Sequence, residues 1–124
     1  MSDGNLSKAK LTQADFTKAN LSRANLREAN LVNTYMPHTI LQGTDLSQAD
    51  LSQADLTGSD LSQSILKGTR FVKTYRPDTI LKDADLSGAN FEGAYGLNPE
   101  KVKSAQNWYQ AKYDADFSKK LGLK

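Results

Sequence analysis

The chain has 124 residues, no cysteine and a formal net charge of +2. This length fits one domain, the absence of cysteine excludes disulfides and thiolate chemistry, and so small a net charge gives no argument for nucleic-acid binding. No segment approaches the roughly 18 apolar residues of a membrane span, and no apolar signal segment follows Met1. Unless the chain is a processed form, we expect a cytoplasmic protein that does not associate with membranes.

A leucine-like residue recurs at every fifth position between residues 4 and 95. Small residues stand two positions before these centres: ten Ala, six Thr, two Ser and Gly4 over 19 positions. Asp or Asn directly precedes the centre in 11 of 19 cases. Of the 18 centres only Arg76 is not apolar; the others are Leu6, Leu11, Phe16, Leu21, Leu26, Leu31, Met36, Leu41, Leu46, Leu51, Leu56, Leu61, Leu66, Phe71, Leu81, Leu86 and Phe91.

A five-residue period fits neither an α-helix nor a flat strand. On a helix each step rotates the side chain by about 140°, so the centres would form no stripe. On a flat strand successive centres would face opposite sides. A corner of roughly 90° after each short extended segment turns every centre inward, so four segments close a square coil of 20 residues. Such units bury their apolar side only by stacking, which predicts about four and a half coils spaced by about 4.8 Å.

The same period predicts the side chains inside and at the corners. Centres 20 residues apart should form internal columns, such as Leu11, Leu31, Leu51, Phe71 and Phe91. Glycines two residues after a centre suit a turn position with positive φ; they are Gly43, Gly58, Gly68, Gly88 and Gly93. The Asp and Asn side chains can satisfy exposed backbone groups at the corners.

Blocks such as Ala49-Asp50-Leu51-Ser52-Gln53 and Ala89-Asn90-Phe91-Glu92-Gly93 resemble the pentapeptide repeat family. The resemblance covers about three quarters of the chain, residues 4–95. It implies an all-β solenoid, a right-handed quadrilateral parallel β-helix. The uninterrupted repeat is similar to pentapeptide repeat proteins abundant in cyanobacteria. Some family members resemble B-form DNA and bind DNA gyrase, so a gyrase inhibitor or protector is the alternative function.

Charge is distributed in bands along the repeat. Residues 8–31 sum to +3, residues 42–66 to −4, residues 67–82 to +4 and residues 83–95 to −3. Neighbouring bands partly neutralise one another, which is typical of a solvated surface, while a charged epitope for a protein partner is the functional alternative. Gyrase-directed mimicry needs a broadly acidic surface, and this banding disfavours it.

Residues 96–124 depart from the repeat and predict a helical cap. Asn98 before Pro99 is a helix-start signal, and apolar residues at helical spacing predict an amphipathic helix over 99–112. A second helix should run from about Asp116 to Leu121, ended by Gly122. The expected cap residues are Leu97, Val102, Trp108, Tyr109 and Phe117, with Trp108 as the plug over the last coil. No comparable cap precedes Leu6, so we expect a monomer, with a dimer through the first coil as the alternative.

A longer repeat is superimposed on the short one, because residues 31–41 reappear as residues 71–81. The offset of 40 is two coils, so both copies lie on the same sides of the rod. Tyr35, Asp55, Tyr75 and Tyr95 should form one outward column, with Ile40, Asp60 and Ile80 on the adjoining side. One interpretation is an ancestral duplication with an altered turn. The other is a binding stripe, and the candidate partner surface is then Tyr35, Ile40, Tyr75, Ile80, Tyr95, Arg70 and Arg76.

Arg76 occupies an inward position, where an unpaired charge is costly. We expect its side chain to swing out or to pair with a carboxylate such as Asp114 or Asp116. His38, the single histidine, has no other metal-ligating or basic partner nearby in sequence and is expected at the surface. A filled rod provides no concave site, so we predict a non-enzymatic interaction or structural scaffold of unknown client, without a cofactor or a metal.

Overall fold

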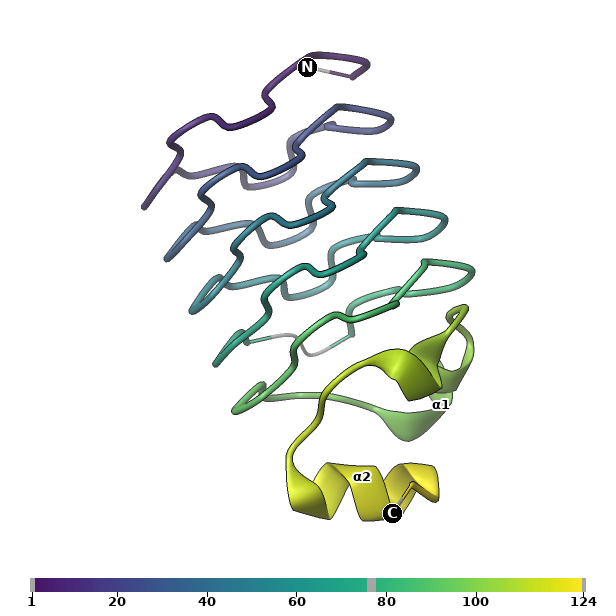
Figure 1. Cartoon of the computed structure of the whole chain (residues 1–124). Helices are drawn as coiled ribbons and strands as arrows, with labels where there is room; N and C mark the ends of the chain where they lie inside the picture. The colour runs from purple at the N-terminus through teal and green to yellow at the C-terminus, as the bar shows by residue number, and fades with distance from the viewer. Residues whose placement is uncertain (1, 76–77, 124) are drawn as a thin grey trace.

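The computed structural model describes residues 2–75 and 78–123, and its chain forms a stack of four-sided coils closed at one end by helices (Figure 1). Parallel β-bridges join residues 20 apart, for example Asp50 to Arg70 and Arg70 to Asn90. Within the described residues each bridge is isolated and no longer strand forms, and turn residues also join neighbouring coils, as the Gln53 N–H donates to the Val72 carbonyl at 2.9 Å. The predicted 20-residue square coil is confirmed.

Backbone hydrogen bonds link each side of a coil in both directions along the rod. The Asp50 N–H donates to the Ala29 carbonyl of the preceding coil at 3.0 Å, and the Leu51 N–H donates to the Arg70 carbonyl of the following coil at 2.8 Å. At the corner, the Ala54 N–H donates to the Leu51 carbonyl at 3.0 Å and closes a tight turn. The backbone of a central coil is thus paired with the coil before it, with the coil after it and within its own turns.

The third residue of each corner turn has a left-handed backbone. The five predicted glycines have φ between 64° and 69°, and polar residues such as Gln53 (φ 63°) share this conformation. Positive φ at the third residue is the requirement of a type II turn. The predicted glycine positions are confirmed, and the same turn is imposed where glycine is absent.

The interior of the rod is filled by the centres of the repeat. From Leu21 to Phe91 the described centres are at most 2% exposed. Phe71 and Phe91 stack with ring centroids 4.7 Å apart and planes 3° apart. The small Thr and Ser residues are buried beside them, and their hydroxyls bond main-chain carbonyls, as Thr69 Oγ1 donates to the Leu46 carbonyl at 2.7 Å. Leu6, Leu11 and Phe16 of the first coil are only half-buried.

The C-terminal segment contains α1 (Pro99–Lys103), the 3-10 helix η1 (Trp108–Gln110) and α2 (Ala115–Leu121). Asn98 caps α1 as predicted, because its Oδ1 accepts from the Glu100 N–H at 2.8 Å. The predicted helix α2 also forms and ends at Gly122, whose φ is 84°. Figure 1 shows α2 lying across the end of the rod, with α1 beside it.

The prediction of a continuous helix over 99–112 is wrong. The helix stops at Ser104, and the chain instead adds further rungs, with Gln106 bridging Asp85 and Lys112 bridging Asn90. The Leu86 N–H donates to the Gln106 carbonyl at 3.0 Å, and the Phe91 N–H donates to the Lys112 carbonyl at 2.8 Å. These last-coil backbone groups need partners, and pairing them with residues 106 and 112 outweighs local helix propensity. The β-ladder therefore continues past residue 95.

Candidate protein-interaction surface

The outward residues before each centre form four columns, one on each wall of the rod. Bridges connect Tyr35 to Asp55, Asp55 to Tyr75 and Tyr75 to Tyr95, and on the next side Ile40 to Asp60 and Asp60 to Ile80. Both predicted columns are confirmed. We call the side of residues 15, 35, 55, 75 and 95 the tyrosine wall and that of residues 20, 40, 60 and 80 the isoleucine wall. The first wall carries residues 5, 25, 45, 65 and 85, and the second wall carries residues 10, 30, 50, 70 and 90.

Large apolar side chains stand exposed on the tyrosine and isoleucine walls. Tyr35, Tyr75 and Tyr95 are 50%, 52% and 65% exposed, and Ile40 and Ile80 are 41% and 44% exposed. Outward tyrosine and isoleucine contribute nothing to the filled interior. The repeat tolerates them because the buried centre, the backbone hydrogen bonds to the two neighbouring coils and the corner turn already determine the local structure.

The chemistry of the corner explains why the tyrosine copies carry proline. At a regular corner Asp55 Oδ1 accepts from the Thr57 N–H at 3.0 Å and from Thr57 Oγ1 at 2.6 Å. Tyr35 cannot accept in this way, but the residue two positions later is Pro37, which has no N–H to satisfy. Replacing the carboxylate by tyrosine therefore leaves no backbone donor unpaired at this corner.

The two copies of the longer repeat produce two apolar bands around this side of the rod. The upper band is Val32, Tyr35 and Ile40, and the lower band is Val72, Tyr75 and Ile80; the valines are half-buried and the other four residues are exposed. One coil separates the bands, and it presents Ser52, Asp55 and Asp60 at the equivalent positions. From Tyr35 to Ile80, apolar and acidic coils thus alternate on the tyrosine and isoleucine walls.

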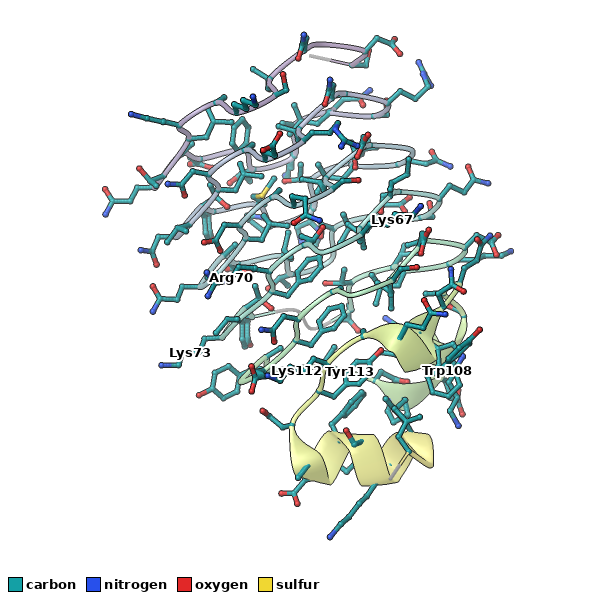
Figure 2. The ribbon with its side chains drawn as sticks, in the orientation of Figure 1. Lys67, Arg70, Lys73, Trp108, Lys112 and Tyr113 are labelled. Atoms are coloured by element: carbon teal, nitrogen blue, oxygen red, sulfur yellow. The ribbon has the colours of Figure 1, made fainter. Side chains whose placement is uncertain are left out.

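Carboxylates near the first and second walls pair with basic side chains from neighbouring coils. Asp45 pairs with Arg27 at 3.2 Å, Asp50 with Arg70 at 3.7 Å, and Asp85 with Lys67 at 3.9 Å. Lys112 reaches Glu92 at 3.3 Å. Figure 2 shows Lys67, Arg70 and Lys73 between the middle and the lower part of the rod, and Lys112 next to Tyr113.

The predicted partner surface is only partly brought together. The tyrosines and isoleucines cluster, whereas Arg70 lies on the adjoining second wall and pairs with Asp50; its part in a partner surface stays a prediction. The five-residue period already separates the two, because residue 70 is 20 residues after residue 50 and not in step with residues 35, 55, 75 and 95. Arg76 lies outside the described residues, so the structure does not test its expected pairing with Asp114 or Asp116. Asp114 accepts from the Gly93 N–H at 3.0 Å.

Asp55 and Asp60 differ from the acids of the other two walls. Their Oδ1 atoms accept from Thr57 and Ser62, but among the described residues neither carboxylate forms an ion pair. The coil between the apolar bands therefore presents two carboxylates without a cationic neighbour in the described part of the chain.

The cap is centred on a residue that the sequence prediction did not select. Tyr113, 8% exposed, stacks on Phe91 at 5.5 Å and donates its hydroxyl to the Trp108 carbonyl at 2.6 Å. Figure 2 shows Tyr113 between the last coil and α2, with Trp108 to one side. Trp108 is half-buried, so its role as the plug is corrected. Tyr109, 57% exposed, is not a cap residue, because the predicted helix that would have turned it inward is absent.

The other predicted cap residues do pack at this end. Val102 is fully buried, and Leu97 and Phe117 are half-buried against the core. Asp85 ties the cap to the rod, since Asn107 Nδ2 donates to its Oδ1 at 3.1 Å. Burial acts to raise the pKa of the Asp85 carboxyl, but hydrogen bonds from Ser87 and Asn107 and the nearby Lys67 outweigh it, and the pKa lies below its ordinary value of 3.8.

No feature of the described residues points to a metal site. Among residues 2–75 and 78–123, no group of three or more His, Asp or Glu side chains is placed to hold an ion. His38 is exposed at the corner between the tyrosine and isoleucine walls, as predicted.

An open hollow of about 560 Å³ lies where the first wall meets the cap, and its lining includes Gln63, Ile65, Asp83 and Asp85. None of the helices in the described part of the chain has the length and apolar character needed to cross a membrane.

A four-sided solenoid with five-residue sides defines a class of repeat protein, and comparison with known families specifies it. The family model of pentapeptide repeats matches residues 5–43 and 41–72, more than half of the chain. The chain belongs to the pentapeptide repeat family. Proteins of this family are generally non-catalytic structural or interaction proteins.

Solved structures of cyanobacterial pentapeptide repeat proteins are similar to this chain. HetL from Nostoc sp. strain PCC 7120, described as involved in heterocyst differentiation regulation, is 36% identical with a TM-score of 0.74. The match covers 75% of this chain and 39% of HetL, so the chain spans less than half of HetL's length. Rfr23 from Cyanothece 51142 is 21% identical with a TM-score of 0.74. This match covers 93% of this chain and 87% of Rfr23, and it shows the fold alone. A comparison with functionally curated proteins found no match.

Proposed function

We propose that this chain is a non-enzymatic scaffold that binds a protein partner through its tyrosine and isoleucine walls. The observation that carries this proposal is the alignment of five large apolar side chains, each more than 40% exposed, on two adjoining sides of a rigid rod. Clustered exposed aromatic and aliphatic residues are typical of interface anchors. A filled rod gives such side chains fixed positions, which lowers the entropic cost of binding.

The alternative of gyrase-directed DNA mimicry is less well supported. A DNA mimic needs a continuous acidic surface, whereas the carboxylates of Asp45, Asp50 and Asp85 are neutralised by basic side chains from neighbouring coils. We further propose that the protein is a monomer in the cytoplasm of a cyanobacterium and that its coil has the right-handed sense of the family. The source of HetL and Rfr23 supports the cyanobacterial origin.

A pull-down with paired variants tests the proposed function. Tyr35→Ser combined with Tyr75→Ser should abolish capture of the partner from a cyanobacterial lysate, while the rod stays folded, because both side chains are exposed. Ile65→Ser on the first wall, where Ile65 is 39% exposed, is the matched control and should capture the partner normally. Unchanged capture by the double variant would refute the proposal, and light scattering of the purified chain checks the monomer.

A further inference from the structure

The alternation of apolar and acidic coils between Tyr35 and Tyr75 restricts which partner segments can bind to the tyrosine wall. Tyr35, Asp55 and Tyr75 occupy three successive coils of this wall, and Tyr95 extends it by one more. Since parallel rungs are about 4.8 Å apart, the two tyrosines stand about 9.6 Å apart with the carboxylate midway. A partner that lies along the rod therefore needs an apolar, basic, apolar sequence of contacts at this spacing.

Resting on the proposed function, we propose that the occupant of the tyrosine wall is an amphipathic α-helix that lies along the rod and places a Lys or Arg over Asp55. Its apolar side chains pack on Tyr35 and Tyr75.

Helix geometry matches the wall, and strand geometry does not. Residues i, i+3 or i+4, and i+7 of a helix lie on one face at about 0, 5 and 10.5 Å, close to the coil spacing. The same-face residues of a strand recur about every 6.7 Å, so a strand along the rod loses register with the coils after one step. The tyrosine wall is thus commensurate with one face of a helix.

Charge selects a basic residue for the middle contact. Among the described residues Asp55 has no cationic partner, unlike Asp50 on the second wall of the same coil, which pairs with Arg70. A Lys or Arg of the partner would pair with this carboxylate, whereas Glu would meet repulsion. Val32 and Val72 at the adjoining corner widen the apolar contact at both ends of the site.

The corner to the isoleucine wall limits the helix to one side. The two walls meet at the ridge formed by exposed His38 and the turns above and below it. A straight helix cannot lie on both sides of a convex edge. The tyrosine wall is the longer one, because its exposed column ends at Tyr95 rather than at residue 80.

Three stapled helical peptides of one Ala-rich background test the proposal against the full chain, with fluorescence anisotropy as the readout. The first has Leu at i and i+7 with Lys at i+4, the second replaces that Lys by Glu, and the third moves the second Leu to i+5. We expect the Lys peptide to bind about fivefold more tightly than the Glu peptide at low salt, and this preference to shrink at high salt. The shifted peptide should bind at least tenfold more weakly than the first.

Two isosteric variants of the chain locate the site. Asp55→Asn keeps the Oδ1 acceptor for Thr57 and removes the charge, so the Lys preference should fall below twofold. Asp50→Asn is the matched control and should leave the preference unchanged, because Asp50 already pairs with Arg70. Tyr35→Ser combined with Tyr75→Ser should weaken binding of the Lys peptide at least tenfold.

Several results would overturn the helix inference. Equal binding of the Lys and Glu peptides, no binding of any peptide at millimolar concentration, or tighter binding of an extended peptide would each do so. A concentration-dependent doubling of mass that the tyrosine double variant abolishes would make a second copy of the chain the occupant. Tyrosine-dependent capture in the pull-down without a Lys preference would leave the proposed function standing and remove only the helix.

Discussion

At the scale of the residue, the corner turn decides which side chains the repeat accepts. The third turn residue has positive φ whether it is Gly88 (φ 66°) or Gln53 (φ 63°). A side chain in this region costs about 1 kcal/mol relative to glycine, and the ladder hydrogen bonds on both sides hold the backbone there. Glycine at these positions therefore relieves strain without changing the path of the chain.

Gly88→Ala isolates this backbone cost. A Cβ at residue 88 would approach nothing closer than 3.8 Å, so the substitution adds conformational strain without a clash. We expect the free energy of unfolding to fall by about 1 kcal/mol in urea denaturation. Gln53→Ala is the control, because the residue already has a Cβ at positive φ, and its effect should stay within about 0.5 kcal/mol. Equal effects of the two substitutions would contradict this explanation.

Asp85 predicts an acid dependence of stability. The pKa of the Asp85 carboxyl in the folded chain is lowered, so the carboxylate contributes stability above its ordinary, unfolded pKa, and this contribution is lost as the pH falls through the folded pKa. The unfolding temperature should therefore decrease between pH 5 and pH 3. Asp85→Asn keeps an oxygen acceptor for Ser87 and should show a smaller decrease in a thermal melt followed by circular dichroism. An unchanged pH profile would show that Asp85 is not responsible.

At the scale of the element, the last coil determines the form of the cap. Gln106 and Lys112 satisfy the exposed ladder groups of residues 84–91, and the chain can reach both only if the helix ends at Ser104. Asn107, with φ 57°, then turns the chain toward η1. The ring of Tyr113 continues the stack of Phe71 and Phe91 at the end of the rod.

Tyr113→Ala tests whether this stack closes the rod. Removing a buried aromatic ring from a packed site costs about 3 kcal/mol, so the unfolding midpoint in urea should fall clearly. Tyr109→Ala, only four residues earlier but 57% exposed, should change stability by less than about 0.5 kcal/mol. Hydrogen exchange should localise the Tyr113 effect to the last coil and α2. A larger loss of stability in Tyr109→Ala than in Tyr113→Ala would contradict the assignment of Tyr113 as the central residue of the cap.

At the scale of the whole molecule, each coil contacts only its neighbours, and stability is therefore distributed along the rod. The described centres from Leu21 to Phe91 are at most 2% exposed, whereas the centres of the first coil are half-buried. The surface also differs between walls, because ion pairs link coils near the first and second walls, whereas five of the exposed large apolar side chains lie on the other two walls.

Two leucine variants measure this distribution. Leu51→Ala in the fully buried centre should destabilise the chain by about 3 kcal/mol, and Leu6→Ala in the first coil by less than about 1 kcal/mol. Urea denaturation of both variants gives the comparison directly. Similar losses would mean that the first coil is as cooperative a part of the rod as its centre.

The sequence by itself determined the coil, its columns and its corners, because each five-residue unit carries its own centre, small residue and turn. Asn98 at the start of α1 and Gly122 after α2 were equally predictable, since capping depends on residues within one turn. The membership of the tyrosine and isoleucine columns followed from the period alone, as the bridges of Tyr35 and Ile40 confirm.

Only the tertiary structure decided the end of the rod and the pairing of its charges. The helix over 99–112 was lost because distant backbone groups at residues 84–91 compete for the same chain. Arg70 and Asp50 are 20 residues apart in sequence and adjacent in space. Their ion pair, and the contrast with Asp55 among the described residues, depends on whether a basic side chain of a neighbouring coil extends to the carboxylate. A local pattern fixes local geometry, whereas hydrogen-bond competition and charge pairing are settled between coils.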